Sequence, residues 1–171
     1  MEKQSYAMSV CRIEPENNIH IILDAFSKMP DKNLVFVGNW EKTNYGRALK
    51  EKYSEYENIT MLLPIYDIKK LNGLRANAAF YVHGHSAGGT NPSLVEAMSL
   101  GLPIVAFDVM YNQETTENKA IFFKDAVSLC RIIQNVSEEE LSQNAENMKK
   151  ISEQRYKWSI VVRKYEKLFF A

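Results

Sequence analysis

The sequence has no excess charge of either sign and no long apolar run. Its 21 basic and 21 acidic side chains cancel to a formal net charge of zero, so it lacks the basic field that holds nucleic acid. No stretch approaches the roughly 20 consecutive apolar residues that a membrane-spanning helix needs. The first predicted strand is not followed by Gly-x-Gly-x-x-Gly, which argues against a simple dinucleotide dehydrogenase.

Cysteine is also scarce. The two cysteines, Cys11 and Cys130, lie far apart in apolar surroundings, so we expect buried thiols in a reducing compartment and neither a disulfide nor a metal site. The polar start at Met1–Gln4 does not resemble a signal peptide, and we expect a cytoplasmic location. Because a strand is predicted within a few residues of Met1, we also expect a domain taken from a longer chain.

Short apolar runs and helical patterns alternate along the 171 residues. The runs are continuously apolar, which is typical of a parallel sheet covered by helices on both faces. No linker divides the chain, so we predict a single Rossmann-like α/β domain, residues 1–171. The predicted strands are Tyr6–Cys11, Leu34–Val37, Ile59–Leu63, Ala78–Val82, Leu102–Phe107 and Ala120–Phe123, with helices beginning near Ile19, Arg47, Asp67, Asn91, Asp125, Ser137 and Trp158, and a polar loop at 108–118.

A glycine turn joins the fourth predicted strand to the next helix. Gly88 and Gly89 can take positive φ and bring the backbone close to a ligand, and Asn91 followed by Pro92 is typical of a helix N-terminus. Amide groups and the helix dipole at such a turn attract anions. We predict an anion site that also includes Thr90; a plain tight turn is the alternative.

Polar side chains follow the predicted strands and should meet at the carboxyl edge of the sheet, where ligands bind in such folds. Arg12 ends the first strand, and its guanidinium suits a diphosphate. The alternative for Arg12 is an ion pair with Glu14, Glu16 or Glu96. Glu96 falls away from the apolar face of its helix, so its carboxylate can accept hydrogen bonds from ribose hydroxyls or remain solvated.

Three segments resemble family 4 glycosyltransferases. They are Arg12-Ile-Glu-Pro-Glu-Asn-Asn18, the run Gly89-Thr-Asn-Pro-Ser-Leu-Val-Glu-Ala-Met98 with its continuation to Ala106, and the closing Tyr156-x-Trp158 helix. The similarity covers almost the whole chain and is nearest to rhamnosyltransferases of bacterial surface polysaccharide synthesis. It implies a GT-B fold of two Rossmann-like domains, of which this chain is the C-terminal, donor-binding one.

The resemblance further implies transfer of a sugar from a nucleotide donor, with retention at the anomeric carbon and without a required metal or other cofactor. The partners it implies are the nucleotide-sugar donor, an N-terminal acceptor-binding domain that is missing here, and peripheral association of the full-length enzyme with a membrane. The isolated domain is expected to be inactive.

By the same resemblance, Arg12 contacts the donor diphosphate and Glu96 binds the ribose, and these two are the expected catalytic residues. The backbone of 88–91 meets the diphosphate or the sugar, and the loop 63–66, which includes Tyr66, borders the base. The chain departs from the family at two positions: Asn17 stands where a lysine is usual, and Gly88 stands where a glutamate is usual. We still expect Asn17 and Gly88, together with His85, among the residues that bind the donor. His83 or His85 could compensate for the missing glutamate.

Two other functions stay open at this stage. A sugar-nucleotide epimerase or hydrolase of the same architecture would need an acid or base such as Glu114 or His85. A non-catalytic nucleotide-binding module would account for the missing lysine and glutamate. His83 and His85 have a spacing that metal ligands can show, but no third ligand is evident nearby. We expect Trp40, Tyr45 and the apolar stripe of 158–169 to serve packing.

Overall fold

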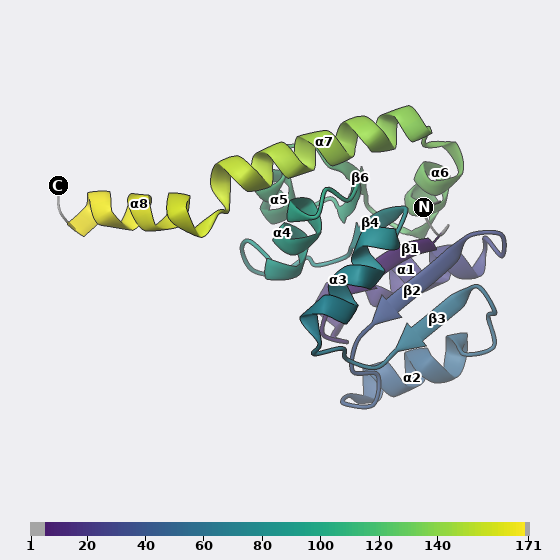
Figure 1. Cartoon of the computed structure of the whole chain (residues 1–171). Helices are drawn as coiled ribbons and strands as arrows, with labels where there is room; N and C mark the ends of the chain where they lie inside the picture. Colours follow the sequence, from purple (N-terminus) through teal and green to yellow (C-terminus); the bar gives the residue numbers. More distant parts are fainter. Residues whose placement is uncertain (1–5, 170–171) are drawn as a thin grey trace.

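The strands pair in the order β3-β2-β1-β4-β5-β6, and all the pairs are parallel. The protein is described by a computed structural model over residues 6–169; the polar start at Met1–Gln4 lies outside that range. The sheet confirms the predicted α/β class and six strands (Figure 1). They are β1 (Tyr6–Val10), β2 (Asn33–Val37), β3 (Ile59–Leu62), β4 (Phe80–His83), β5 (Ile104–Phe107) and β6 (Ile121–Phe123).

Helices follow the strands, as the sequence predicts, with three differences. The segment 108–118 is not a loop throughout, because it contains the short helix α5, and Pro15–Asn17 forms a 3-10 turn. The second helix begins earlier than predicted, since Thr43 caps it and accepts a hydrogen bond from the amide of Gly46. The helices are α1 (Ile19–Ser27), α2 (Asn44–Tyr53), α3 (Ile68–Asn77), α4 (Pro92–Ser99), α5 (Met110–Thr115), α6 (Ala126–Asn135), α7 (Glu138–Arg155) and α8 (Trp158–Phe169).

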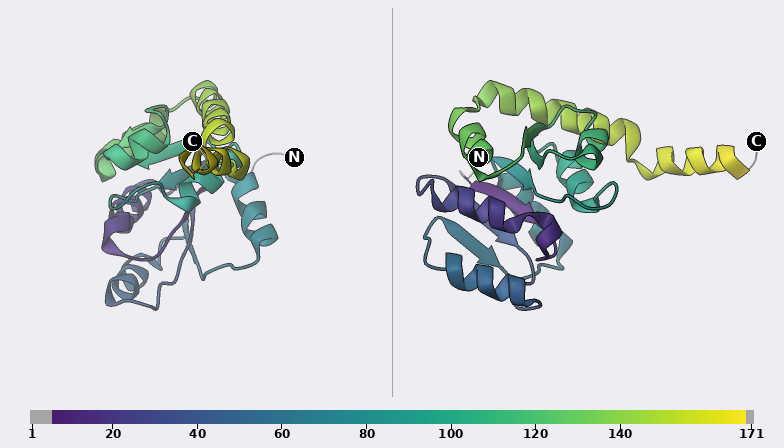
Figure 2. Two further views of the ribbon diagram at one scale, coloured as in Figure 1. Left: turned by 90° about the vertical axis from the view of Figure 1, so that its left-hand side faces the viewer. Right: turned by 180° about the vertical axis from the view of Figure 1, so that it is seen from behind.

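Each face of the sheet carries its own apolar cluster. On one face α1, α2 and α6 cover the strands, and on the other face α4 and α7 do, with α3 packed beside them (Figure 2). In β1, Ala7 belongs to the first cluster while Tyr6 and Met8 belong to the second. Both faces of the strand are therefore buried, which explains why the strands read as continuous apolar runs.

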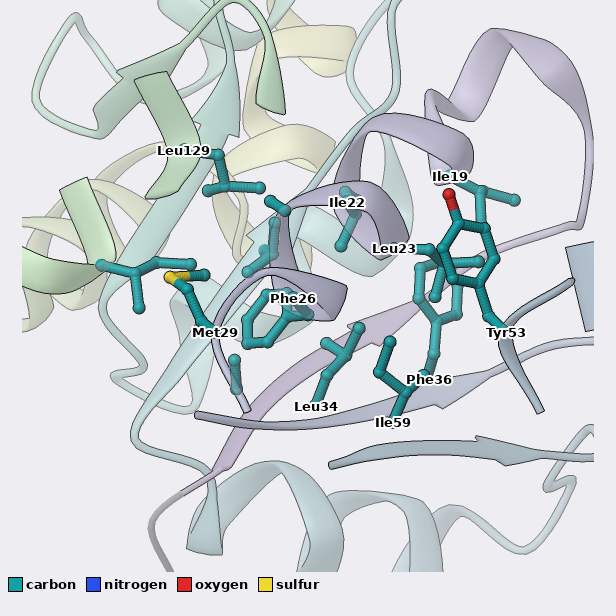
Figure 3. Packing of buried hydrophobic residues seen from close by; sticks show 14 of the residues in the cluster. Ile19, Ile22, Leu23, Phe26, Met29, Leu34, Phe36, Tyr53, Ile59 and Leu129 are labelled. Carbon is teal, nitrogen blue, oxygen red and sulfur yellow. The ribbon is translucent and has the colours of Figure 1, made fainter. Parts of the chain in front are cut away.

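Helix α1 shows how the pattern becomes packing. Ile19, Ile22, Leu23 and Phe26 lie along one face of the helix and are at most 1% exposed. They contact Leu34 and other residues of the same cluster (Figure 3). Each such side chain contributes about 1.5–3 kcal/mol by leaving water. This packing fixes α1, and with it the loop between β1 and α1.

The strand order reverses at β1. The chain runs outward from β1 through β2 to β3, and then returns to place β4 on the other side of β1. β1 and β4 pair only at Ala7–Phe80 and Met8–Tyr81, after which they separate. Beyond that point the Ser9 hydroxyl donates to the Val82 carbonyl at 2.7 Å and the Tyr81 hydroxyl donates to the Val10 carbonyl at 3.0 Å. Side-chain hydrogen bonds thus replace the backbone hydrogen bonds between β1 and β4 at the point where the two strands separate.

Helix α8 extends away from the rest of the domain (Figures 1 and 2). The expected packing of its apolar stripe is formed only in part within residues 6–169, because Trp158, Leu168 and Phe169 are each at least 75% exposed. No helix within residues 6–169 has the length and apolar character needed to cross a membrane.

Both cysteines are free thiols, as predicted, but neither is fully buried. Cys11 lies directly beyond β1 at the carboxyl edge of the sheet and is half-buried. Burial raises the pKa of its thiol to about 12. Cys130 lies half-buried on α6, with its Sγ 3.4 Å from the carbonyl oxygen of Ala25. The prediction of free thiols is therefore confirmed, whereas the prediction that both thiols are buried was too strong.

Candidate functional site

A hollow of about 390 Å³ lies at the carboxyl edge of the sheet, between the loops that follow β1 and β4. We call it the central hollow. Its position is where the strand order reverses, and ligands of open α/β sheets bind at that point. Its lining comes from the β1 loop, α3, the β4 loop and the start of α4: Val10, Cys11, Arg12, Asn17, Leu71, Arg75, His85, Asn91, Pro92, Ser93 and Glu96.

A second hollow, of about 280 Å³, adjoins the first and shares Val10, Cys11 and Arg12 with it. We call it the side hollow. It is lined by the loops after β2 and β3, including Gly38, Asn39 and the segment 64–66. Tyr66 is at its border and is 89% exposed, so its ring is available to a ligand. The two hollows together make an elongated site at one edge of the sheet.

Arg12 lies at the junction of both hollows, directly beyond β1. Its side chain is exposed, and within residues 6–169 it forms no ion pair, including none with Glu14, Glu16 or Glu96. The structural ion pair that was the alternative for Arg12 is therefore not formed. Its guanidinium is available for an anion in either hollow.

Asn17 lines the central hollow, but its side-chain amide is engaged within the protein. It is 3% exposed, its Nδ2 donates to the Arg12 carbonyl at 2.7 Å, and its Oδ1 lies 2.7 Å from Nδ1 of His85. Both ends of the amide are thus engaged within the protein. Because Oδ1 can only accept, Nδ1 of His85 must donate, and Nε2 of a neutral ring is left as an acceptor. Burial lowers the pKa of His85, which favours that neutral ring.

Further hydrogen bonds join the β1 loop to the β4 loop. The amide and the hydroxyl of Ser86 both donate to the Glu16 carbonyl at 2.9 Å, and Nδ2 of Asn18 donates to the Gly84 carbonyl at 2.9 Å. Asn112 of α5 adds a bond from its Nδ2 to the His85 carbonyl, also at 2.9 Å. The two loops that border the central hollow therefore hold a fixed separation.

The glycine turn has one left-handed residue, not two. Gly88 has φ +96°, whereas Gly89 does not have positive φ. Asn91 caps α4 as predicted, accepting from the Ser93 amide at 3.0 Å, and Pro92 takes the first helical position. The first turn of α4 is therefore already capped. In the described chain no hydrogen bond engages the amides of 88–91, so these loop amides are the donors left for an anion.

Glu96 lines the central hollow, and its carboxylate has a partner that the sequence did not reveal. Arg75 of α3 places Nη2 2.6 Å from Oε2 of Glu96. Arg75 is only 3% exposed and lines the same hollow. From the sequence it looked like an ordinary basic residue in a helix, and only the pairing of α3 with α4 identifies it.

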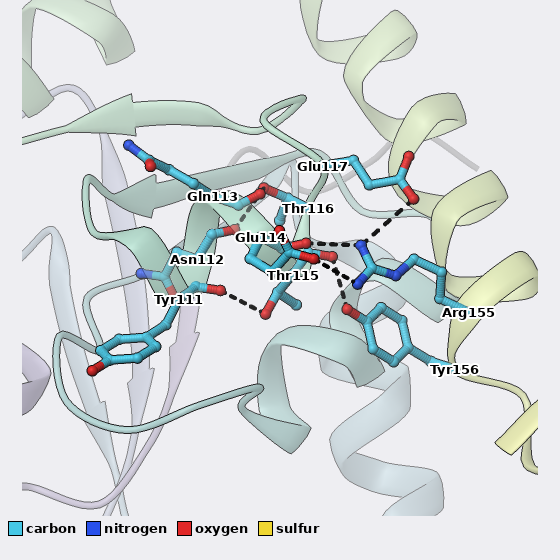
Figure 4. A network of polar contacts seen from close by, with 9 residues as sticks. All are labelled: Tyr111, Asn112, Gln113, Glu114, Thr115, Thr116, Glu117, Arg155 and Tyr156. Atoms are coloured by element: carbon cyan, nitrogen blue, oxygen red, sulfur yellow. Dashed lines mark hydrogen bonds and ion pairs between the residues drawn. The ribbon is translucent and has the colours of Figure 1, made fainter. Parts of the chain in front are cut away.

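Glu114 is turned away from the central hollow. Its carboxylate lies 3.0 Å from Nη2 of Arg155, and the same arginine donates to the Glu114 carbonyl at 2.9 Å (Figure 4). This network joins α5 to the end of α7. Glu114 lines neither hollow, so of the two residues that an epimerase or hydrolase was expected to use as acid or base, only His85 lies at the central hollow.

Trp40 and Tyr45 serve packing, as predicted. Trp40 is 1% exposed, and its indole N–H donates to the Leu62 carbonyl at 3.1 Å. The Tyr45 hydroxyl contacts the backbone and ring of His20.

Thr90 is exposed in the β4 loop and lines neither hollow.

His83 is enclosed in the fold. It is 2% exposed, its ring stacks on Tyr81 with centroids 6.1 Å apart, and its Nε2 has no hydrogen-bond partner. Burial lowers the pKa of His83 to about 3. His83 is therefore neutral at pH 7 and cannot contact a ligand, so of the two histidines only His85 can compensate for the missing glutamate. Residues 6–169 contain no cluster of three potential metal ligands.

The buried His83 predicts acid lability. Below pH 6.5 the unfolded chain binds a proton at His83 that the folded chain does not bind until about pH 3. Stability is thus lost as the pH falls through this window, by up to about 1.4 kcal/mol per pH unit. Urea unfolding between pH 4.5 and 7.5 should show this slope, and His83→Phe, which keeps a ring on Tyr81, should flatten it. Equal slopes in both proteins would contradict the assignment.

A hollow of about 430 Å³, larger than the central hollow, lies elsewhere, between α6, α7 and β6. We call it the α6–α7 groove. It contains none of the predicted site residues, and its lining is rich in uncharged amides such as Asn135, Gln143 and Asn147. The guanidinium of Arg12 and the start of α4 at Asn91 lie instead at the central hollow.

A parallel sheet of this strand order, with a hollow at the reversal point, defines one Rossmann-like half of a GT-B fold. Residues 1–158 match the family described as glycosyl transferases group 1. The chain belongs to this family. No curated protein matches the sequence.

Solved structures share the fold at low identity. Sucrose-phosphate synthase (tll1590) from Thermosynechococcus elongatus aligns with TM-score 0.82 and 18% identity over 99% of this chain and 46% of its own. Anabaena Alr3699/HepE, solved with UDP and glucose, gives 0.81 and 20% over 99% and 49%. The C-terminal domain of the group 1 protein LpcC from Francisella tularensis gives 0.72 and 17% over 90% and 87%. The chain thus spans about half of the first two proteins.

Proposed function

We propose that this chain binds the nucleoside-diphosphate sugar of a retaining glycosyltransferase, and that the central hollow holds the diphosphate, the ribose and the sugar. The observation that carries the proposal is the meeting of Arg12, Asn91 at the start of α4 and Glu96 in one hollow at the strand reversal, next to the uncommitted amides of 88–90. A cation with backbone donors suits a diphosphate, and a carboxylate suits ribose hydroxyls. Membership of the glycosyl transferases group 1 family supports this reading.

The side hollow fits the base. It adjoins the central hollow through Arg12, and its outer wall is the segment 64–66. The exposed ring of Tyr66 offers a stacking surface, while the backbone of the same loop offers donors and acceptors for the edge of the base. Two similar structures were solved with UDP, one also with glucose and one also with GlcNAc.

In the transfer step, the bond between the anomeric carbon and the diphosphate oxygen breaks, and negative charge develops on the departing diphosphate. Arg12 and the loop amides are placed to stabilise that charge. Arg12 and Glu96 are therefore our proposed catalytic and binding residues, with Gly88, Gly89, Thr90 and Asn91 contributing backbone. We propose that these groups suffice without a metal.

Nε2 of His85, which can accept a hydrogen bond, offers one contact for the donor sugar. This nitrogen lies 3.7 Å from the position that a Cβ at Gly88 would occupy, so it faces the place where the family's glutamate would begin. A neutral hydrogen-bond acceptor there can take a hydrogen bond from a sugar hydroxyl.

We propose rhamnosyl or related transfer in bacterial surface polysaccharide synthesis, with a second domain binding the acceptor substrate.

Calorimetric titration of the chain with UDP, dTDP and GDP tests this function. We expect one of the three to bind, and the matching nucleoside without phosphates to bind at least tenfold more weakly, because the charged contacts to Arg12 are lost. A folded chain that binds none of the three would contradict the proposal. The same chain alone should not turn over any nucleotide sugar, since it lacks an acceptor domain.

A further inference from the structure

Arg75 is a buried cation with incomplete compensation. It stands in the last turn of α3, where the helix dipole favours positive charge, and only 3% of its side chain is exposed. Its Nη1 lies 3.2 Å from Oδ1 of Asn72 and its Nη2 lies 2.6 Å from Glu96, but its Nε has no hydrogen-bond partner. Burying a guanidinium in this state is costly, so a merely structural role explains it poorly.

The partner of Arg75 is not buried with it. The side chain of Glu96 is 55% exposed and rises from the middle of α4 into the central hollow. An exposed glutamate normally samples several rotamers, and ordering it on binding costs free energy. The ion pair holds the carboxylate through Oε2. Within the described chain no hydrogen bond engages Oε1, so one oxygen is fixed in direction and available.

We propose that Arg75 is a positioning residue that orients Glu96 toward the ribose hydroxyls of the donor nucleotide. A carboxylate that is anchored at one oxygen accepts from a diol without first losing rotamer freedom. This inference rests on the proposed function, because it deepens the role of the same hollow.

The test compares each nucleotide with its 2′,3′-dideoxy counterpart. UDP and GDP lose both ribose hydroxyls in this comparison, whereas dTDP, which is already a 2′-deoxy nucleotide, loses only its 3′-hydroxyl. UDP, dTDP and GDP and their dideoxy forms are titrated into the native chain and into Arg75→Met. If Arg75 acts through Glu96, the preference for the hydroxylated sugar falls by about tenfold in Arg75→Met, while the affinity for the dideoxy form hardly changes. A general loss of structure would instead weaken both forms alike.

Two further variants keep the test decisive if Arg75→Met folds poorly. Asn72→Ala removes the second restraint on Arg75 without touching Glu96, and it should lower the ribose preference in the same direction but less. In a Glu96→Gln background, changing Asn72 or Arg75 should have no further effect on that preference, because the positioned carboxylate is gone.

The outcomes separate this proposal from the proposed function. An unchanged ribose preference in folded Arg75→Met and Asn72→Ala would overturn the role of Arg75 and leave the nucleotide site standing. Absence of binding by the native chain to every hydroxylated and dideoxy nucleotide would overturn both. A tenfold fall confined to the hydroxylated forms supports both.

Discussion

Replacing Arg12 with alanine should weaken the binding of a nucleoside diphosphate by about 10- to 100-fold, because one or two charge-assisted hydrogen bonds are lost. Arg12 borders both hollows and has no ion-pair partner among residues 6–169. Its removal should therefore leave the free energy of unfolding nearly unchanged. Calorimetry measures the affinity, and urea unfolding measures the stability.

Arg131→Ala is the matched control for Arg12→Ala. Arg131 is an exposed arginine on α6 that lines neither hollow. Each substitution removes one positive charge, so the two variants have the same net charge. We expect Arg131→Ala to bind as the native chain does. The affinity for the nucleoside without phosphates should be the same in all three proteins. Equal weakening by both substitutions would show that only the overall charge matters, which would contradict a specific role for Arg12.

The largest loss of stability is expected for Gly84→Ala. A Cβ at Gly84 would lie 2.2 Å from the carbonyl oxygen of Asn17 and 3.0 Å from Cδ1 of Ile22. The first neighbour is backbone and cannot rotate away, so the β1 and β4 loops would have to separate. We expect a loss of about 3 kcal/mol or more, since both overpacking and broken loop-to-loop hydrogen bonds contribute.

Gly73→Ala is the comparison for Gly84→Ala. Gly73 lies in the middle of α3, and a Cβ there would meet nothing within 4 Å. Alanine should therefore stabilise the chain by about 0.5–1 kcal/mol through its better helix propensity. Urea denaturation of the two variants gives the free energies directly. A Gly84→Ala protein as stable as the native chain would contradict the tight junction of the two loops.

Much of the fold could be predicted because its signals are local. The apolar runs marked all six strands to within about two residues, and the caps at Asp67, Asn91 and Ser137 formed as expected. Capping depends on residues that are near in sequence, and strand burial is visible in composition. The short helix α5 escaped prediction because its six residues are largely polar and lack an apolar period.

The site was predicted less completely, because its chemistry depends on contacts between distant residues. Asn17 looked like a weakened anion ligand, and only its bond to His85, 68 positions away, shows that it braces the loops. No sequence pattern singled out Arg75, and only its contact with Glu96 gives it a role. On the same helix Ile68 is 72% exposed while Arg75 is buried, which is the reverse of what residue type alone favours.

Glu114 illustrates the opposite error. It follows the fifth strand, so it lies near the carboxyl edge, and the sequence allowed it a contact with the sugar. The short helix α5 instead directs its side chain to Arg155 at the end of α7 (Figure 4). Strand order places a residue at an edge, but the local helix decides which way the side chain points.

The central claim is that the donor nucleotide lies in the central and side hollows, and hydrogen exchange with and without the bound nucleotide tests it most directly. We predict that the nucleotide slows exchange of backbone amides in three loops, at 12–17, 64–67 and 85–93, and leaves the α6–α7 groove unchanged. Slower exchange confined to the groove residues at 132–147, with the three loops unaffected, would contradict the account.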